Sequence, residues 1–584
     1  MVETADNREA WLDSLLLGLL CMLVYIGNAT FVNPSGDSVP TSVLPFSLLI
    51  HHNFYVGRYI VQPHQPIPYY IHAFRNHFIS GSPIGAAITS IPIYAAYLLF
   101  GGHPGAVAGA SLGKVSAVLI SGISVVWLYW VMTRLSVSRL TRLIFTVLYG
   151  LGSETMSISS QGLWQHGPAQ LWIVAFLFFV TTIYSDDATK KWFYVGAGVA
   201  VGMLLLSRPV DLVLIVPFLL LCRQGRIFRS IWITIISFLP FLVLNMVYDY
   251  HFFGHILSTG YGSASTEASL FSFPLIPGLM GNLFSPSKGL FVFMPWTLVS
   301  FAWLRHLRSK RFTDSVYLPA LLSFIPYIIL YALFYQWPAG YSYGPRYMSD
   351  VLPILTLLGA GYASAYWDVN WTPRKASTFA VLTSFVAAWS IGVQLLGTYV
   401  ESGGAWNAAA RPNTFMSPLW AARGSQPAYY LNTLKALLFQ PSPINNPSAS
   451  FSSLQLLDKP YIFRKGTTPT SFLTNTVYHG TIIAKNTGAA GWSAYPNRAG
   501  ADVVHFSYTV WGHGKEITQV PSIRTALLHS VQSGQSIKVY FQFLTPSTPG
   551  TYTYVFTLVD EGVAWFQGGL DSKNAVISSI RVKG

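Results

Sequence analysis

The feature that most constrains this chain is a series of long apolar runs with almost no charge inside them. Of its 584 residues, 52% are hydrophobic and only 10% are Asp, Glu, Lys or Arg. A soluble globular domain has about 25% charged residues. Because roughly twenty apolar residues are enough for a helix to cross the hydrocarbon core of a bilayer, most of the first four hundred residues are predicted to face lipid.

About eleven such runs predict an α-helical polytopic membrane protein. They lie near residues 11–30, 106–132, 143–160, 168–184, 192–207, 210–222, 231–249, 290–304, 315–335, 351–367 and 378–400. The pair that meets at Arg208-Pro209 is short, so the number is approximate. The first run has no basic segment before it and no small-residue cleavage site after it, which favours an uncleaved helix over a signal peptide.

The basic residues fall into alternate loops and set the predicted orientation. They gather at residues 134–142, 190–191, 223–229, 305–311 and 374–375. Loops rich in Lys and Arg stay on the cytoplasmic side, so the N-terminus is predicted to be cytoplasmic and the C-terminal part extracytoplasmic. This distribution also accounts for the net charge of +14. Nucleic acid is not expected as a partner, because no basic stripe is interleaved with aromatic residues.

The same pattern divides the chain into three parts. Residues 1–400 form the predicted transmembrane domain, with long outer loops at 31–105 and 251–289 that are rich in aromatic residues, His, Pro and Gly. Loops of this length in a compact domain are usually functional. Residues 401–470 are polar and predict a linker with short helices. Residues 471–584 contain short alternating strands separated by turns, which predict an extracytoplasmic β-sandwich domain.

Ionisable residues near the outer face are the first candidates for chemistry, because charge near a bilayer is costly. Asp37 follows the first helix and could act as a general base, although its Pro/Gly-rich loop also favours an Asx-turn. His166, between two predicted spans, either contacts a substrate or is a hydrogen-bonded structural residue. Arg75, in the first long loop, is a further candidate for substrate binding.

Two cations occur on the predicted outer face, against the topological rule. Lys288 and Arg346 lie in Gly/Pro-rich segments where the backbone can approach a ligand closely. Phosphate is a natural counterpart for both, and an ion pair of Arg346 with Asp350 is the alternative. Tyr343 ends an aromatic stretch that could stack on sugar rings or form an interfacial belt.

Several other classes of site have no motif in the sequence. It contains no phosphate-binding G-x-x-x-x-G-K-[ST], no H-E-x-x-H and no G-x-S-x-G. Its two cysteines, Cys21 and Cys222, are too few for a disulfide framework or a zinc site. No metal ligands and no cofactor are therefore predicted from motifs.

Taken in order, the motifs resemble those of a known superfamily over roughly residues 10–400. They are Gly36-Asp-Ser-Val-Pro40, Ser82-Pro-Ile-Gly85, Leu163-Trp-Gln-His-Gly-Pro168, Ser207-Arg-Pro209, Tyr250-His-Phe-Phe-Gly254, Phe284-Ser-Pro-Ser-Lys-Gly289 and Gly340-Tyr-Ser-Tyr-Gly-Pro-Arg-Tyr347. In this order and placement the chain resembles the GT-C membrane glycosyltransferases. The resemblance is greatest to bacterial proteins related to the protein O-mannosyltransferase and lipid A aminoarabinose transferase group.

The resemblance implies a function at the outer face of a bacterial inner membrane. A sugar would pass from a polyprenyl-phosphate donor to a glycan, lipid or protein acceptor. By resemblance, Asp37 is the catalytic base and Lys288 and Arg346 bind the lipid phosphate. Ser38 stands where many relatives carry a second acidic residue, so dependence on a divalent metal is left open.

Two rival functions belong to other classes. A transporter or flippase of lipid-linked sugars predicts inverted repeats, and the sequence contains no evident repeat. A non-catalytic envelope scaffold requires only the anchoring helices and the C-terminal domain, and it would leave Asp37 dispensable.

Overall fold

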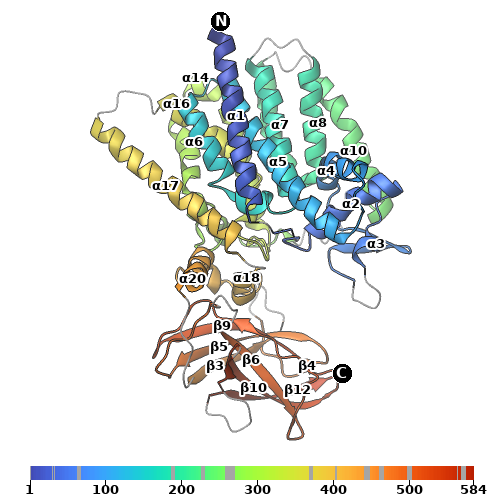
Figure 1. Cartoon of the computed structure of the whole chain (residues 1–584), viewed down its shortest axis with the longest axis vertical. Helices are drawn as coiled ribbons and strands as arrows, with labels where there is room; N and C mark the ends of the chain where they lie inside the picture. The colour runs from blue at the N-terminus through green and yellow to red at the C-terminus, as the bar shows by residue number, and fades with distance from the viewer. Residues whose placement is uncertain are drawn as a thin grey trace. The chain divides into compact units, whose positions relative to one another are not determined.

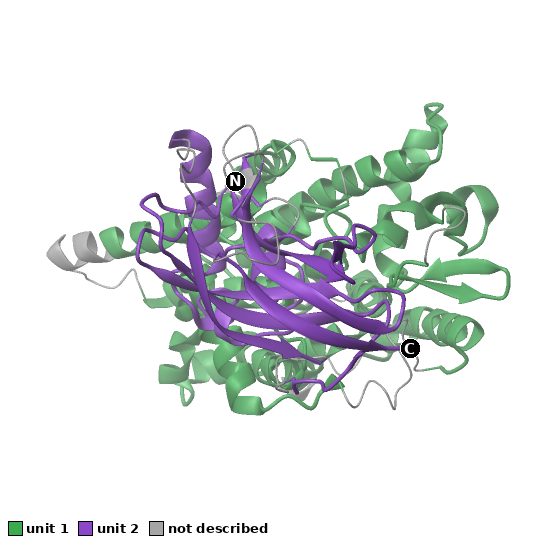
Figure 2. Cartoon of the chain, turned by 90° about the horizontal axis from the view of Figure 1, so that it is seen from below, with its two compact units in different colours: residues 1–284, 289–337, 344–399 green, residues 285–288, 338–343, 400–584 purple. Residues whose placement is uncertain are grey.

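Helices make up most of the chain before residue 400 in the computed structural model, and strands dominate near its C-terminal end (Figure 1). The structure describes residues 2–28, 30–31, 33–61, 67–185, 191–224, 231–256, 270–366, 373–401, 404–439, 448–458, 466–495, 503–561, 563–566 and 574–584. Two compact units result (Figure 2). Unit 1 is Met1–Phe284, Gly289–Trp337 and Gly344–Tyr399, and unit 2 is Ser285–Lys288, Pro338–Tyr343 and Val400–Gly584.

Among the described residues, five helices of unit 1 are long and apolar enough to cross a membrane. They are α1 (Val2–Ile26), α5 (Ala106–Arg134), α7 (His166–Ser185), α10 (Ile231–Phe253) and α17 (Pro373–Tyr399). Their length and composition are those of membrane-spanning helices. The predicted membrane class is therefore confirmed.

The other predicted spans are shorter or irregular, so the predicted number of about eleven is not confirmed. They correspond to α6 (Arg139–Gly150) with the π-helix η1 (Thr155–Ser159), α8 (Lys191–Ser207), α9 (Leu212–Ile215) with the 3-10 helix η3 (Val216–Gln224), α13 (Leu290–Phe293) with the 3-10 helix η5 (Pro295–His306), α15 (Tyr317–Leu333) and α16 (Leu352–Tyr366). Proline contributes to the irregularity, because it lacks the N–H that an α-helix needs. Pro295 begins η5, and Pro209 begins the short 3-10 helix η2 (Pro209–Asp211).

The first predicted outer loop is mostly regular structure. It contains α2 (Ser38–His51), α3 (Gly57–Ile60), the antiparallel hairpin β1 (Ile71–Phe74) and β2 (His77–Ser80), and α4 (Gly85–Leu99). Helix α4 begins against the end of α8, where a Cβ on Gly85 would lie 2.3 Å from the Ser207 backbone nitrogen. Only glycine permits this approach. The buried residues Ala87 of α4 and Leu206 of α8 belong to one core cluster.

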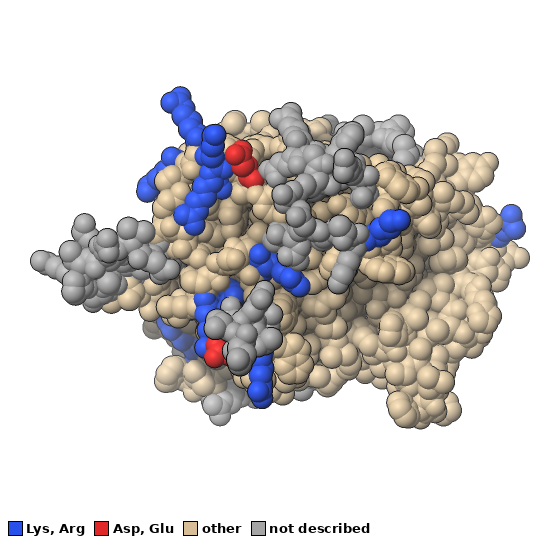
Figure 3. Space-filling model, turned by 90° about the horizontal axis from the view of Figure 1, so that it is seen from above, with Lys and Arg blue, Asp and Glu red and all other residues tan. Residues whose placement is uncertain are grey.

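Basic side chains gather at the end of unit 1 where the chain begins (Figure 3). Exposed residues there belong to the predicted cytoplasmic clusters, at the end of α5, the start of α6 and the start of α14 (Lys310–Thr313): Arg134, Arg139 and Lys310. Lys190, Arg226 and Arg229 belong to the same predicted clusters and lie outside the described residues. The orientation across a membrane stays a prediction.

Unit 2 confirms the predicted C-terminal β-rich region and contains two antiparallel-rich sheets. One has the order β4-β12-β10-β6-β7, with β8 paired to β6 and β11 to β10, and the other has the order β3-β5-β9. Aromatic side chains join the sheets, since the Phe541 ring of β9 lies 4.7 Å from Phe506 of β6 and 5.2 Å from Phe556 of β10. The strands are β3 (Ala449–Leu457), β4 (Phe472–Leu473), β5 (Val477–Asn486), β6 (Val504–Gly512), β7 (Lys515–Glu516), β8 (Thr525–Ala526), β9 (Ser536–Leu544), β10 (Gly550–Asp560), β11 (Ala564–Trp565) and β12 (Val576–Lys583).

The segment predicted as a linker with short helices, 401–470, contains such helices and also a strand. Three helices lie in it, α18 (Ala405–Ala410), α19 (Ser417–Trp420) and α20 (Gln426–Phe439), followed by strand β3. Strand β3 pairs along its length with β5. The β-rich region therefore begins at Ala449, before the predicted boundary at residue 471.

Candidate functional site

Asp37 stands at the N-cap of α2, in the first predicted outer loop. Its side chain makes no capping hydrogen bond, so it does not make the contact that an Asx-turn requires. Its backbone N–H donates to Ser35 Oγ at 3.2 Å, and Ser82 Oγ donates to its carbonyl oxygen at 3.1 Å. The backbone is thus held while the carboxylate is directed elsewhere, and 26% of the side chain is exposed.

Arg346 is the ion-pair partner of Asp37. Its Nη1 atom lies 3.6 Å from Asp37 Oδ2, and its guanidinium carbon lies 4.8 Å from the centre of the Trp164 ring. The guanidinium also lies 5.3 Å from the Tyr347 ring. Such stacking orients a guanidinium and leaves its N–H groups directed sideways. Arg346 therefore pairs with Asp37 and not with Asp350, which was the predicted alternative.

Tyr69 is the second side chain on the Asp37 carboxylate. Its hydroxyl donates to Asp37 Oδ1 at 3.3 Å. Partial desolvation of its hydroxyl, reinforced by the Asp37 charge, raises the pKa of Tyr69 to about 12, although 75% of the residue is exposed. The phenol therefore stays protonated and able to donate at neutral pH. Gly36 makes this approach possible, because a Cβ there would lie 2.6 Å from the Tyr69 hydroxyl.

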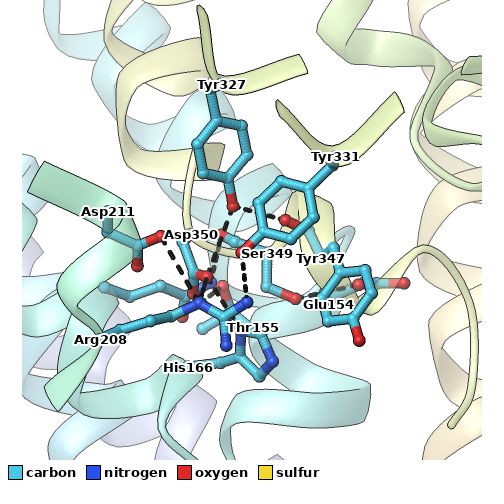
Figure 4. Close-up of polar contacts among 11 residues, drawn as sticks. Glu154, Thr155, His166, Arg208, Asp211, Tyr327, Tyr331, Tyr347, Ser349 and Asp350 are labelled. Atoms are coloured by element: carbon cyan, nitrogen blue, oxygen red, sulfur yellow. Dashed lines mark hydrogen bonds and ion pairs between the residues drawn. The ribbon is translucent and has the colours of Figure 1, made fainter. Parts of the chain in front are cut away.

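A second ionic cluster lies in the interior of unit 1 (Figure 4). Asp350 accepts from His166 Nδ1 at 2.9 Å and lies 2.9 Å from Arg208 Nε. Arg208 is also 3.5 Å from Asp211, and its Nη2 donates to Tyr331 Oη at 2.5 Å. Asp350 and Asp211 are fully buried and His166 is almost so. We call these five residues the buried network.

The buried network holds the segment that carries Arg346. The segment begins with the 3-10 turn η6 (Arg346–Met348) and ends at Asp350. Between them, Ser349 Oγ donates to Glu154 Oε2 at 3.0 Å, and the Ser349 carbonyl accepts from Gln170 at 2.7 Å. One end of a five-residue segment is therefore fixed inside the helices, while its other end presents a guanidinium to Asp37.

His166 and Arg75 occupy different surroundings from the Asp37 pair. His166 belongs to the buried network, through its bond to Asp350. Arg75 is exposed at the turn between β1 and β2, with φ of +52° and its guanidinium carbon 5.3 Å from the Phe74 ring. Neither is among the described contacts of Asp37, and their roles in substrate binding stay predictions.

Lys288 and Tyr343 belong to unit 2. The Lys288 ammonium is buried, donates to the Ser342 carbonyl and lies 5.6 Å from the Trp406 ring. Tyr343 is buried too, with its ring 5.8 Å from that of Tyr430. Burial raises the pKa of the nearby Glu401 carboxyl, and the Lys288 charge opposes that rise. The predicted phosphate-binding pair is thus divided, with Arg346 in unit 1 and Lys288 in unit 2.

Three further residues of unit 1 with specific contacts were not predicted from the sequence. Tyr69 and Trp164 contact the ion pair but look like ordinary interfacial aromatic residues. Lys114 lies inside a run that reads as apolar, yet its buried ammonium donates to Gln161 Oε1 at 2.8 Å. A basic residue in the interior of a predicted span was the signal for Lys114, whereas the two aromatic residues gave none.

The described residues contain no group of three or more His, Cys, Asp or Glu that could hold a metal ion. In comparisons of the sequence with family models and with curated proteins, nothing matches this chain. The resemblance to the GT-C glycosyltransferases therefore stays a prediction, and the function is argued from the geometry of the site.

Proposed function

We propose that this protein transfers a sugar from a polyprenyl-phosphate-linked donor to a hydroxyl group of an envelope glycan, lipid or protein. The observation that carries the proposal is the pairing of Asp37 with Arg346 in a unit of membrane-spanning helices. The two side chains lie 3.6 Å apart, and both are partly exposed, at 26% and 12%. A bacterial inner membrane, with the site on its outer face, is part of the proposal.

This pair offers the two groups that such a transfer needs. The acceptor hydroxyl has to lose a proton, and a carboxylate within hydrogen-bond reach can accept it. The departing lipid phosphate carries negative charge, which an arginine binds with two parallel hydrogen bonds. The apolar helices around the pair suit a donor with a long polyprenyl chain, because that chain belongs in the hydrocarbon core.

The reaction follows from these roles. The acceptor oxygen forms a bond to the anomeric carbon of the donor while its proton passes to Asp37. The bond between the anomeric carbon and the phosphate oxygen breaks, and its electron pair leaves with the phosphate, which is held by Arg346. In the free protein the two residues neutralise each other, so donor binding would replace Asp37 as the partner of Arg346. This exchange would release the carboxylate to act as the base.

Lys288 is a second candidate for binding an anionic group, and its site is built within unit 2. Its ammonium is directed at the Ser342 carbonyl, which also accepts from Gln426 at 3.0 Å. The proposed reaction is derived through Asp37 and Arg346 alone. Lys288→Ala measures separately whether unit 2 contributes to donor binding.

The decisive experiment is Asp37→Asn, assayed for single-turnover transfer and for binding of a polyprenyl-phosphate sugar. Loss of a general base lowers the transfer rate by about two to four orders of magnitude. Donor affinity should be unchanged or increased, because the substitution releases Arg346 from its carboxylate. The matched control is Glu9→Gln, which removes an exposed carboxylate from Arg139 and should leave both quantities unchanged.

Transfer at the normal rate by Asp37→Asn would contradict the proposal and favour a scaffold. Donor transport across vesicles by the purified protein, unaffected by Asp37→Asn, would favour the transporter. A variant that loses donor binding together with transfer would place Asp37 in binding and remove its assignment as the base.

A further inference from the structure

A cavity in unit 2 is lined by none of the residues that the proposed reaction uses. It has a volume of about 520 Å³, which falls in the range of small-molecule sites. One wall is formed by helix α20 and the turn before it, and the other by the segments around residues 493–495 and 529–535. All of these segments belong to unit 2.

Both walls of the cavity are fixed by specific contacts. On the helix side, the Tyr429 ring lies 5.1 Å from that of Tyr495, and Asn432 Nδ2 donates to Tyr495 Oη at 3.4 Å. On the sheet side, Trp492 and Val531 exchange two backbone hydrogen bonds of 2.9 and 3.0 Å. A cavity framed in this way is formed before any ligand arrives, which lowers the cost of ordering on binding.

The chemistry of the lining points to a sugar. Asn432, Gln532 and Gln535 carry amides that both donate and accept hydrogen bonds, as paired sugar hydroxyls require. Ser493 and Ser530 add hydroxyl groups. Phe439 lines the cavity with a ring that is 81% exposed, and an exposed ring next to amides offers a surface for a sugar face.

The charge of the lining points to an anion. Arg423 and Lys435 both line the cavity and are both exposed, and the described residues of its lining include no Asp or Glu. Cations without neighbouring carboxylates bind phosphate or carboxylate groups by charge-assisted hydrogen bonds. We infer that this cavity binds an acidic oligosaccharide, with Arg423 and Lys435 on its carboxylate or phosphate and the amides on its hydroxyls. The inference rests on unit 2 alone and does not depend on sugar transfer by unit 1.

The test is calorimetric titration of the full-length protein in a neutral detergent. The probes are short oligogalacturonides, sugar phosphates and uncharged maltooligosaccharides of matched length. We expect saturable binding of an acidic sugar, and binding of the uncharged one that is at least about tenfold weaker, because a hydrogen bond to a charged group contributes more than a neutral one. The preferred probe then identifies the anion as carboxylate or phosphate.

The variants assign that binding to the cavity. Arg423→Ala and Lys435→Ala should each weaken binding of the acidic sugar by about tenfold or more. Asn432→Leu should weaken acidic and uncharged sugars alike. The matched control is Lys515→Ala, an exposed lysine of β7 outside the cavity lining, which should change affinity by less than about twofold. Unchanged unfolding temperatures would show that each variant is folded.

Three outcomes would overturn the inference. The first is no saturable binding of either acidic sugar up to about 10 mM, which is weaker than small-ligand sites normally bind. The second is an equal loss of affinity for the acidic sugar in Lys515→Ala and Lys435→Ala, which would show that the overall charge of the protein, and not the cavity, causes the binding. The third is binding to vesicles of phosphatidylglycerol that depends on Arg423 and Lys435, without any sugar binding, which would make this face a site for lipid headgroups.

Discussion

Asp37 and Asp350 are both carboxylates that pair with an arginine in unit 1, yet their surroundings differ. Asp350 has no exposed surface and is contacted by His166 and Arg208 at 2.9 Å. Asp37 is 26% exposed, and its arginine lies 3.6 Å away. The two carboxylates are connected through one short segment, because Arg346 and Asp350 are its first and last residues.

This difference separates a structural role from a chemical one. A buried ion pair is weak support for stability, but removing one partner leaves an uncompensated charge in the interior. The buried network therefore fixes the backbone of residues 346–350. A partly exposed pair has a smaller desolvation cost, so a ligand can replace one partner. The longer and partly exposed ion pair, Asp37–Arg346, is therefore the one suited to a reaction.

The largest expected effect in this comparison is on stability, from Asp350→Asn. The variant leaves His166 without its carboxylate and Arg208 with only Asp211, 3.5 Å away, and a broken buried pair costs about 3–5 kcal/mol. Asp37→Asn should cost less, because a partly exposed pair has a smaller desolvation cost than a fully buried one. The measurement is the unfolding temperature of both variants in the same detergent. Equal shifts would remove the distinction between the two clusters.

How much of this could be predicted from the sequence depends on the kind of pattern. The membrane class and the C-terminal strands follow from long apolar runs and from alternation, which are local. The number of spans does not, because prolines such as Pro295 convert apparent spans into short and 3-10 helices. Apolar composition alone does not distinguish a long helix from a broken one.

The candidate site was predictable only as separate residues. Asp37 and Arg346 stood out because each is a charge in an unusual context, but their pairing joins positions far apart in the chain. Lys288 also stood out. It lies in the segment Ser285–Lys288, which belongs to unit 2 although the residues on both sides of it in the sequence belong to unit 1. His166 was a candidate for substrate contact, and its bond to the buried Asp350 could not be seen in the sequence.

An intermediate effect is expected on donor binding, from Arg346→Lys. Lysine keeps the charge but loses the planar fork and the stacking on Trp164. A hydrogen bond to a charged group contributes about 1.5–3 kcal/mol, so affinity for a polyprenyl-phosphate donor should fall by at least about tenfold. The matched control is Arg308→Lys, an exposed arginine. Unchanged affinity in Arg346→Lys would mean that the donor phosphate binds elsewhere, and Lys288→Ala would then be the variant to measure.

The smallest effect is expected from Tyr69→Phe, which removes only the hydroxyl that donates to Asp37 at 3.3 Å. A single hydrogen bond contributes about 0.5–1.5 kcal/mol, so transfer should fall by about two- to tenfold. Because partial desolvation and the Asp37 charge raise the pKa of Tyr69 to about 12, its protonated form predominates well above neutral pH. The loss should therefore be the same factor across about pH 6 to 9, below the ordinary pKa of tyrosine. Transfer rates of both proteins over that range test this. If the wild-type rate fell above pH 8 and the Tyr69→Phe rate did not, Tyr69 would be titrating there, and its assignment as the hydrogen-bond donor to Asp37 over this pH range would be wrong.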